Sequence, residues 1–102
     1  MTTIDLNADL GETVDGVPTA DDEALFAVIS SANIACGGHA GDLDSMVEAV
    51  ERAARFGVVI GAHPSYPDRP GFGRLPLAMA TAELRGTVSA QLDALADVGA
   101  DI

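Results

Sequence analysis

The segment IDLNADLGE, residues 4–12, places oxygen-bearing side chains at regular intervals. In an extended chain its apolar residues line one face, and Asp5, Asn7 and Asp9 line the other. Such a face either contacts water or forms the inside of a site. Because crowded acids repel one another, their presence favours a functional use of the charge. We therefore interpret Asp9 and Glu12 as candidate catalytic groups, and Asp5 and Asn7 as candidate substrate-binding or phosphate-binding groups.

A second candidate group lies in the glycine-rich segment NIACGGHAGD, where Cys36, His39 and Asp42 are each three residues apart. Glycines allow backbone amides to face a phosphate or carboxylate at the start of a helix, so Asn33, Gly37 and Asp42 are candidate ligand-binding residues. Asp42 is also well placed to cap the helix that follows. His39 is a candidate for catalysis or metal ligation. Cys36 has no basic neighbour in the sequence and is predicted to be buried rather than reactive.

The segment GAHPSYPDRPGFGR contains a third group. His63 follows an apolar run and precedes a proline, which fixes it at the end of a strand, and we interpret it as catalytic. Arg74 offers a guanidinium that can hold a carboxylate or a phosphate. The simpler interpretation is a rigid connector with a surface arginine. If a metal ion is bound, the candidate ligands are Asp9, His39 and His63.

The elements that must position these residues alternate between strand and helix. The first is the extended run over residues 4–10. A Thr-x-x-acid pattern from Thr19 to Asp22 predicts the start of a helix through DDEALFAVI, after the turn DGVPT, and SSANIAC is predicted to be a strand. VVIGAH is nearly all apolar and is predicted to be a strand covered on both faces.

Two longer helices follow from the apolar periodicity. Asp42 caps and Gly57 ends the first, whose predicted buried stripe is Leu43, Met46, Val47, Val50 and Ala54. The second runs from about Thr81 to Val98, and its predicted buried stripe is Leu84, Val88, Leu92 and Leu95.

This order predicts an α/β protein with a parallel sheet, the first strand in the centre and the helices outside. Ligand sites in parallel sheets lie beyond the carboxyl ends of the strands. We therefore expect His39 and His63 to lie within about 10 Å of Asp9 across one cleft. Three strands leave two open edges, so we expect residues 1–102 to be a single partial barrel domain, a fragment of a longer chain that is not stable as an isolated monomer.

The composition excludes several classes of function. The chain has 102 residues and a formal net charge of −11, with five arginines and no lysine. This charge disfavours nucleic acid and anionic membranes as partners. The absence of lysine excludes a P-loop lysine, a Schiff base and a lysine nucleophile. A single cysteine, and an N-terminus without the pattern of a secretory leader, favour a cytoplasmic protein.

Four motifs in this order, IDLNADLGE, SSANIACGGHAGD, GAHPSYPD and GFGR, resemble the LamB/YcsF family, which supplies the A subunit of bacterial 5-oxoprolinase. The resemblance implies the N-terminal βαβαβα part of a distorted (β/α) barrel of the glycoside hydrolase or deacetylase type. Family members are about two and a half times as long. Two residues depart from the family pattern: Gly38 stands where phenylalanine is usual, and Leu75 stands where a second arginine is usual.

The resemblance implies ATP-dependent opening of the 5-oxoproline lactam to glutamate, with Mg²⁺ as the counter-ion of ATP and with subunits B and C as partners. In this reaction Asp9 or Glu12 would activate water, His39 and His63 would polarise or protonate, and Arg74 would hold an anion. Homo-oligomerisation stays open.

Three alternatives remain from the sequence. A metal-dependent deacetylase or amidohydrolase acting on a small amide or sugar would use His39, His63 and an acid. A phospho-receiver is disfavoured, because its third strand should end in an aspartate rather than in His63. An inactive fragment or a binding module is the third alternative.

Overall fold

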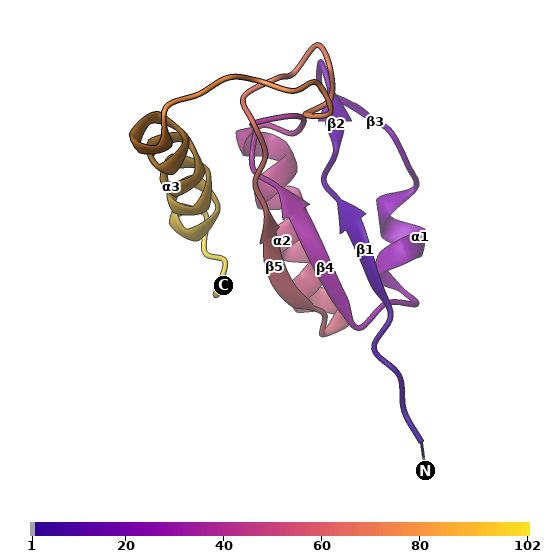
Figure 1. The fold of residues 1–102 in the computed structure, drawn as a ribbon. Coiled ribbons are helices and arrows are strands. Elements are labelled where there is room, and N and C mark those ends of the chain that lie inside the picture. Colours follow the sequence, from indigo (N-terminus) through magenta and orange to yellow (C-terminus); the bar gives the residue numbers. More distant parts are fainter. Residues whose placement is uncertain (1) are drawn as a thin grey trace.

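A parallel three-stranded sheet forms the centre of the structure, a computed structural model that describes residues 2–102 (Figure 1). Its strands, in spatial order, are β1 (Asn7–Leu10), β4 (Ser31–Ala35) and β5 (Val59–His63). Both pairings are parallel, which confirms the predicted α/β class. The prediction that the first strand is central is wrong. β4 takes this place because it carries the most buried apolar side chains, whereas β1 alternates with exposed polar residues.

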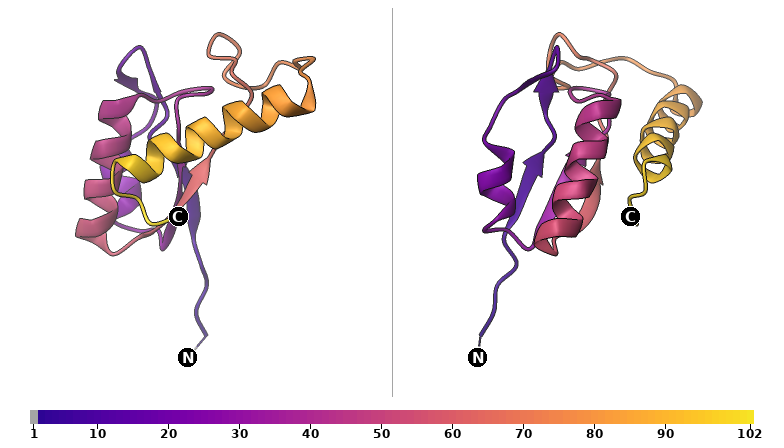
Figure 2. Two further views of the ribbon diagram at one scale, coloured as in Figure 1. Left: turned by 90° about the vertical axis from the view of Figure 1, so that its left-hand side faces the viewer. Right: turned by 180° about the vertical axis from the view of Figure 1, so that it is seen from behind.

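Two helices, α1 (Asp22–Phe26) and α2 (Leu43–Phe56), cover one face of this sheet, and α3 (Thr81–Asp97) runs across its edge beside β5 (Figure 2). Seen from behind, α2 lies over the strands between the other two helices (Figure 2). The core between helices and sheet is mostly aliphatic, and its largest fully buried side chains are Phe26, Leu10, Ile34 and Leu95. The opposite face of the sheet is largely polar, and neither α1 nor α2 lies on it.

The strand register aligns the polar residues in rows. Asp9 of β1 lies opposite Asn33 of β4, which in turn lies opposite Gly61 of β5. Two residues further along, Ala35 lies opposite His63, the last residue of β5. Because side chains alternate between the two faces of a sheet, Asp9, Asn33 and His63 share the face opposite α1 and α2, called the open face below.

α1 is shorter than predicted and begins differently. Its cap is Asp21, whose Oδ1 accepts a hydrogen bond from the backbone N–H of Ala24 at 3.2 Å. The predicted cap, Thr19, instead donates its hydroxyl to the carbonyl of Glu12 at 2.6 Å. This contact holds Thr19 beside the short hairpin that precedes α1, formed by β2 (Thr13–Val14) and β3 (Val17–Pro18).

α2 begins and ends where the sequence predicts. Asp42 and Ser45 form a reciprocal capping box, and Gly57 ends the helix in the left-handed conformation with φ of 70°. The buried face is only partly as predicted. Met46 is buried, but Leu43 is 62% exposed, and the small residues Ala49 and Ala53 face the sheet with Ser45. Small side chains let the helix backbone lie close to the strands, which a hydrophobicity pattern does not reveal.

Replacing Asp42 by alanine should lower the free energy of unfolding by about 1 kcal/mol, because the N–H of Ser45 loses its side-chain acceptor at 2.8 Å. The change is measured as a shift of the urea midpoint. Asp42→Asn is the matched control. Asparagine caps helices as well as aspartate does, so this variant should keep most of the free energy of unfolding that Asp42→Ala loses. Equal losses in both variants would show that the capping contact is not the source of the effect.

The environments of β5 and α3 refine two further predictions. β5 is not covered on both faces, because Val59 lies on the open polar face and is 68% exposed. α3 has the predicted extent, and Leu95 of its predicted stripe is fully buried. Gln91, one turn earlier, is also buried and was not predicted to be. Within residues 2–102, no helix combines the length and the apolar character needed to cross a membrane.

Candidate active site

The carboxyl ends of the three strands meet around one cleft of about 240 Å³. Asp9 belongs to β1, Glu12 follows β1, His39 lies in the loop between β4 and α2, and His63 ends β5. This volume is below the roughly 300–1,000 Å³ of pockets that take drug-sized ligands, so it suits a small molecule. The lining residues are Asp9, Glu12, His39, His63, Ser65, Phe72, Gly73 and Arg74.

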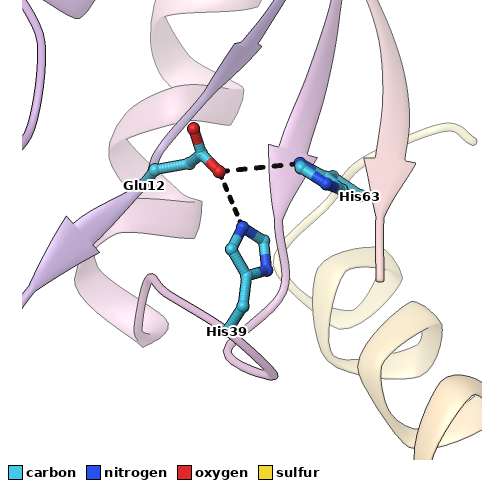
Figure 3. A group of neighbouring side chains, drawn as sticks. All are labelled: Glu12, His39 and His63. Carbon is cyan, nitrogen blue, oxygen red and sulfur yellow. Dashed lines mark hydrogen bonds and ion pairs between the residues drawn. The ribbon is translucent and has the colours of Figure 1, made fainter. Parts of the chain in front are cut away.

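His39 and Glu12 form the closest pair in the cleft. Nε2 of His39 lies 2.7 Å from Oε2 of Glu12, and the side chains are 3% and 18% exposed (Figure 3). The second ring nitrogen, Nδ1, lies 3.2 Å from the hydroxyl of Ser65. Phe72 meets the imidazole edge to face, with 5.1 Å between ring centroids. With both nitrogens and the ring in contact, the orientation of His39 is fixed.

His63 faces both acids of the cleft. Its Nδ1 lies 3.8 Å from Oε2 of Glu12 and 3.8 Å from Oδ1 of Asp9. Its ring centroid is 4.5 Å from that of His39. The expected proximity of the two histidines to Asp9 is therefore confirmed. At 3.8 Å neither contact is a hydrogen bond, and Nδ1 of His63 is buried without a hydrogen-bond partner among residues 2–102.

The loop after β5 and the helix α3 supply residues that the sequence did not identify as functional. Gln91 of α3 accepts a hydrogen bond from the N–H of Ser65 at 3.0 Å and donates to its carbonyl at 2.8 Å. Asp68, also buried, accepts hydrogen bonds from the N–H groups of Gly71 and Leu75 and so shapes the turn. The two hydrogen bonds of Gln91 hold Ser65 beside His39. The composition of the segment after β5 predicts a loop, but it does not predict which residues of the loop contact His39 or α3.

Arg74 is exposed at the rim of the cleft, where its guanidinium lies 5.4 Å from the centroid of Phe72. Among residues 2–102 it is the only arginine that lines this cleft. Arg69, by contrast, donates to the carbonyls of Gly37 at 2.9 Å and Gly41 at 2.7 Å. Gly37 is therefore part of the loop that carries His39, and it does not line the cleft.

Side-chain amides of β1 and β4 form a chain of hydrogen bonds that includes Asp9. Nδ2 of Asn33 donates to Oδ1 of Asn7 at 2.6 Å and to Oδ1 of Asp9 at 3.0 Å. Asn7 in turn donates to the hydroxyl of Ser31 at 2.8 Å. Asn7 and Asn33 thus lie on the open face beside the cleft and orient Asp9, but they do not line the cleft itself.

Two predicted binding residues lie away from the cleft. Asp42 caps α2, and its carboxylate is engaged there. Asp5 precedes β1 at the amino end of the sheet, where it accepts hydrogen bonds from the hydroxyls of Ser30 and Ser31. At a rise of about 3.3 Å per residue, Asp5 is about 13 Å from Asp9 along an extended chain. Asp5 shares a strand face with Asp9, but the cleft lies at the carboxyl end of the strands and Asp5 lies at the amino end.

The hydrogen bonds from Ser30 and Ser31 hold the pKa of Asp5 below its ordinary value. A carboxyl whose pKa is lowered by folding contributes stability at pH values above its unfolded pKa, and this contribution is lost as the pH falls through the folded pKa. We expect Asp5→Asn to remove part of the loss of stability between about pH 5 and pH 2. Urea unfolding at several pH values measures this. If the free energy of unfolding depends on pH in the same way for Asp5→Asn and for the parent protein, the prediction is contradicted.

Cys36 is buried, as predicted, and its thiol lies 3.1 Å from the carbonyl of Ile34. Burial raises the pKa of this thiol, which disfavours the reactive thiolate. Cys36 is a structural part of the core rather than a nucleophile.

The fold and the cleft define an α/β protein whose candidate site lies at the carboxyl edge of a parallel sheet. Residues 4–101 match the LamB/YcsF family, and the chain belongs to this family. Two relatives are 5-oxoprolinase subunits A. The one from Chloroflexus aggregans is 52% identical over 98 residues, and the one from Methylococcus capsulatus is 55% identical over 94 residues.

These alignments cover 96% and 92% of this chain but 39% and 36% of the relatives. A solved structure, the lactam utilization protein from Thermus thermophilus, superposes with a TM-score of 0.89 at 41% identity. That match covers 95% of this chain and 39% of the solved one. The chain therefore spans about two fifths of the length of the proteins it resembles.

Proposed function

We propose that this chain acts as the N-terminal part of the A subunit of 5-oxoprolinase, in the ATP-dependent opening of 5-oxoproline to glutamate. The observation that carries the proposal is the convergence of Glu12, His39 and His63 at the carboxyl edge of the sheet, in a cleft sized for a small molecule. The names of relatives that are about half identical over most of the chain support the reaction.

The chemistry of a lactam suits the groups in this cleft. A five-membered lactam is a poor electrophile, and transfer of a phosphoryl group to its oxygen would make the ring carbon open to attack by water. Water then needs a base, and Glu12 and Asp9 are the two carboxylates that line the cleft. His39 and His63 lie beside them and are placed to polarise the ring oxygen or to protonate the departing nitrogen.

Arg74 is the group that we propose to hold an anion, either the carboxylate of 5-oxoproline or a phosphate of ATP with its Mg²⁺. The guanidinium is exposed at the rim and stacks on Phe72, so it is free to form paired hydrogen bonds. Leu75, in place of the second arginine expected from the family pattern, leaves this role to one guanidinium. We place the reaction in the cytoplasm, where ATP is available, with subunits B and C completing the enzyme.

We further infer that the sheet is part of a distorted (β/α) barrel in the full-length subunit. The helices α1 and α2 lie on one face of the sheet, and the other face is polar, as expected for strands that surround a central site. In such a barrel Asp9, Asn33 and His63 point toward the interior.

The test is release of glutamate from 5-oxoproline by the full-length A subunit together with subunits B and C. We expect release to require ATP and all three subunits, with about one ATP consumed per glutamate when the reaction is coupled. Omitting the A subunit is the matched control. Release without ATP, or hydrolysis of a simple acetamide by the A subunit alone, would contradict the proposal and favour an amidohydrolase.

A further inference from the structure

We propose that Glu12, His39 and His63 form a binding site for one divalent transition-metal ion. Each of the three side chains offers one ligand atom, and these atoms all lie within 4.8 Å of one another. They come from three separate strand ends, so the sheet itself brings them together. The sequence named Asp9 with the two histidines, whereas the geometry selects Glu12 as the carboxylate ligand.

The separations suit a small ion. Ligand atoms at about 2.0–2.2 Å from a tetrahedral ion are about 3.3–3.6 Å from one another. The distances from Oε2 of Glu12 are 2.7 Å to Nε2 of His39 and 3.8 Å to Nδ1 of His63, on either side of that range. Side-chain rotations that move these atoms by less than about 1 Å would bring both nitrogens to ligand distance.

The environment of each histidine supports ligation. Nδ1 of His63 is buried and has no hydrogen-bond partner among the described residues, a costly state that a metal ion would relieve. His39 has its other nitrogen beside the hydroxyl of Ser65, and Gln91 fixes Ser65 through two backbone hydrogen bonds. Such outer contacts commonly orient a ligating imidazole, and here they aim Nε2 of His39 at Glu12.

The ligand set also indicates the class of ion. Two imidazoles and one carboxylate favour zinc, cobalt, nickel, iron or manganese over Mg²⁺ and Ca²⁺, which prefer oxygen ligands. The ion in the inferred site is therefore a different one from the Mg²⁺ that accompanies ATP. Three protein ligands beside an open cleft leave at least one position for water or substrate, as in catalytic metal sites.

The inferred metal site gives different roles to the two carboxylates of the cleft, Glu12 and Asp9. If Glu12 is a ligand, Asp9 remains to accept a proton, since it is half-exposed and lies 3.8 Å from His63. A bound ion would polarise an oxygen and lower the pKa of water. This use of the ion rests on the proposed function, but binding of the ion does not.

The experiment uses the full-length subunit after treatment with a chelator and titrates it with Co²⁺. We expect one Co²⁺ per chain, a visible absorption band typical of nitrogen and oxygen ligands, and loss of the band when Zn²⁺ is added. Glu12→Gln, His39→Gln and His63→Gln should each weaken Co²⁺ binding by about 100-fold or more. Glu51→Gln, an exposed carboxylate on α2, is the matched control and should bind as the parent protein does.

Folding of each variant is checked by circular dichroism, and His63→Gln is the variant least expected to disturb folding because His63 is 31% exposed. Asp9→Asn should retain Co²⁺ binding within about threefold, because Asp9 is not a ligand. Absence of stoichiometric binding by the parent protein, or undiminished binding by folded His63→Gln, would overturn the inference. Both readouts are made without 5-oxoproline, so failure of the proposed reaction leaves this result unaffected.

Discussion

Replacing Glu12 by glutamine, or His39 by glutamine, is expected under the proposed function to lower kcat/KM for 5-oxoproline in the assembled enzyme by at least about 100-fold. Glutamine keeps the approximate size of glutamate but cannot accept a proton or carry the charge that faces His39 and His63. At position 39 it removes the imidazole that lies 2.7 Å from Glu12 and 3.2 Å from Ser65. Glutamate release in the presence of ATP and all three subunits is the measurement.

Glu51→Gln is again the matched control, since it removes a carboxylate from the exposed side of α2 and should leave kcat/KM unchanged. His39 is 3% exposed, so its variant is compared with the parent protein by thermal melting before its activity is interpreted. If folded Glu12→Gln and His39→Gln both retain activity within about threefold, a catalytic role for Glu12 and His39 is excluded, and so is a metal ion held by them. Asp9 and His63 would then be the candidate reacting groups that remain in the cleft.

Local signals explain why α2 could be predicted and the order of the strands could not. Asp42 and Gly57 act through contacts within a few residues, the capping box and the left-handed end, so their effect is visible in the sequence. The central place of β4 depends on pairing with segments about 25 residues away on either side. A polar pattern such as that of β1 shows which side chains share a face, but not which neighbour the strand has.

The residues of the candidate site also fall into those that could be predicted from the sequence and those that could not. Glu12, His39 and His63 could be grouped in advance because parallel strands place their carboxyl ends at one edge. Ser65 and Gln91 could not, because their contact joins a loop to a helix 26 residues further along the chain. Asp5 lies away from this group, because its spacing from Asp9 places it on the same strand face but at the amino end of the sheet.

Gly38 is expected to resist replacement by phenylalanine, the residue that the family pattern favours at this position. A Cβ atom here would overlap Oε1 of Gln91 and lie 2.7 Å from the hydroxyl of Ser65. A larger side chain must displace Gln91, which is buried and makes two hydrogen bonds to the backbone of Ser65. Gly38→Phe should therefore lower the free energy of unfolding by about 2–4 kcal/mol, measured by urea denaturation.

Shortening Gln91 should relieve much of this clash. Gln91→Ala alone loses the two hydrogen bonds to Ser65, but in the double variant with Gly38→Phe it also opens space for the aromatic ring. The loss of stability in the double variant should therefore be smaller than the sum of the two single losses by at least about 1 kcal/mol. Additive losses would show that Gly38 and Gln91 do not share this space. A coupled result would mean that the usual phenylalanine and the Gln91–Ser65 contact are alternative ways of filling the region behind His39.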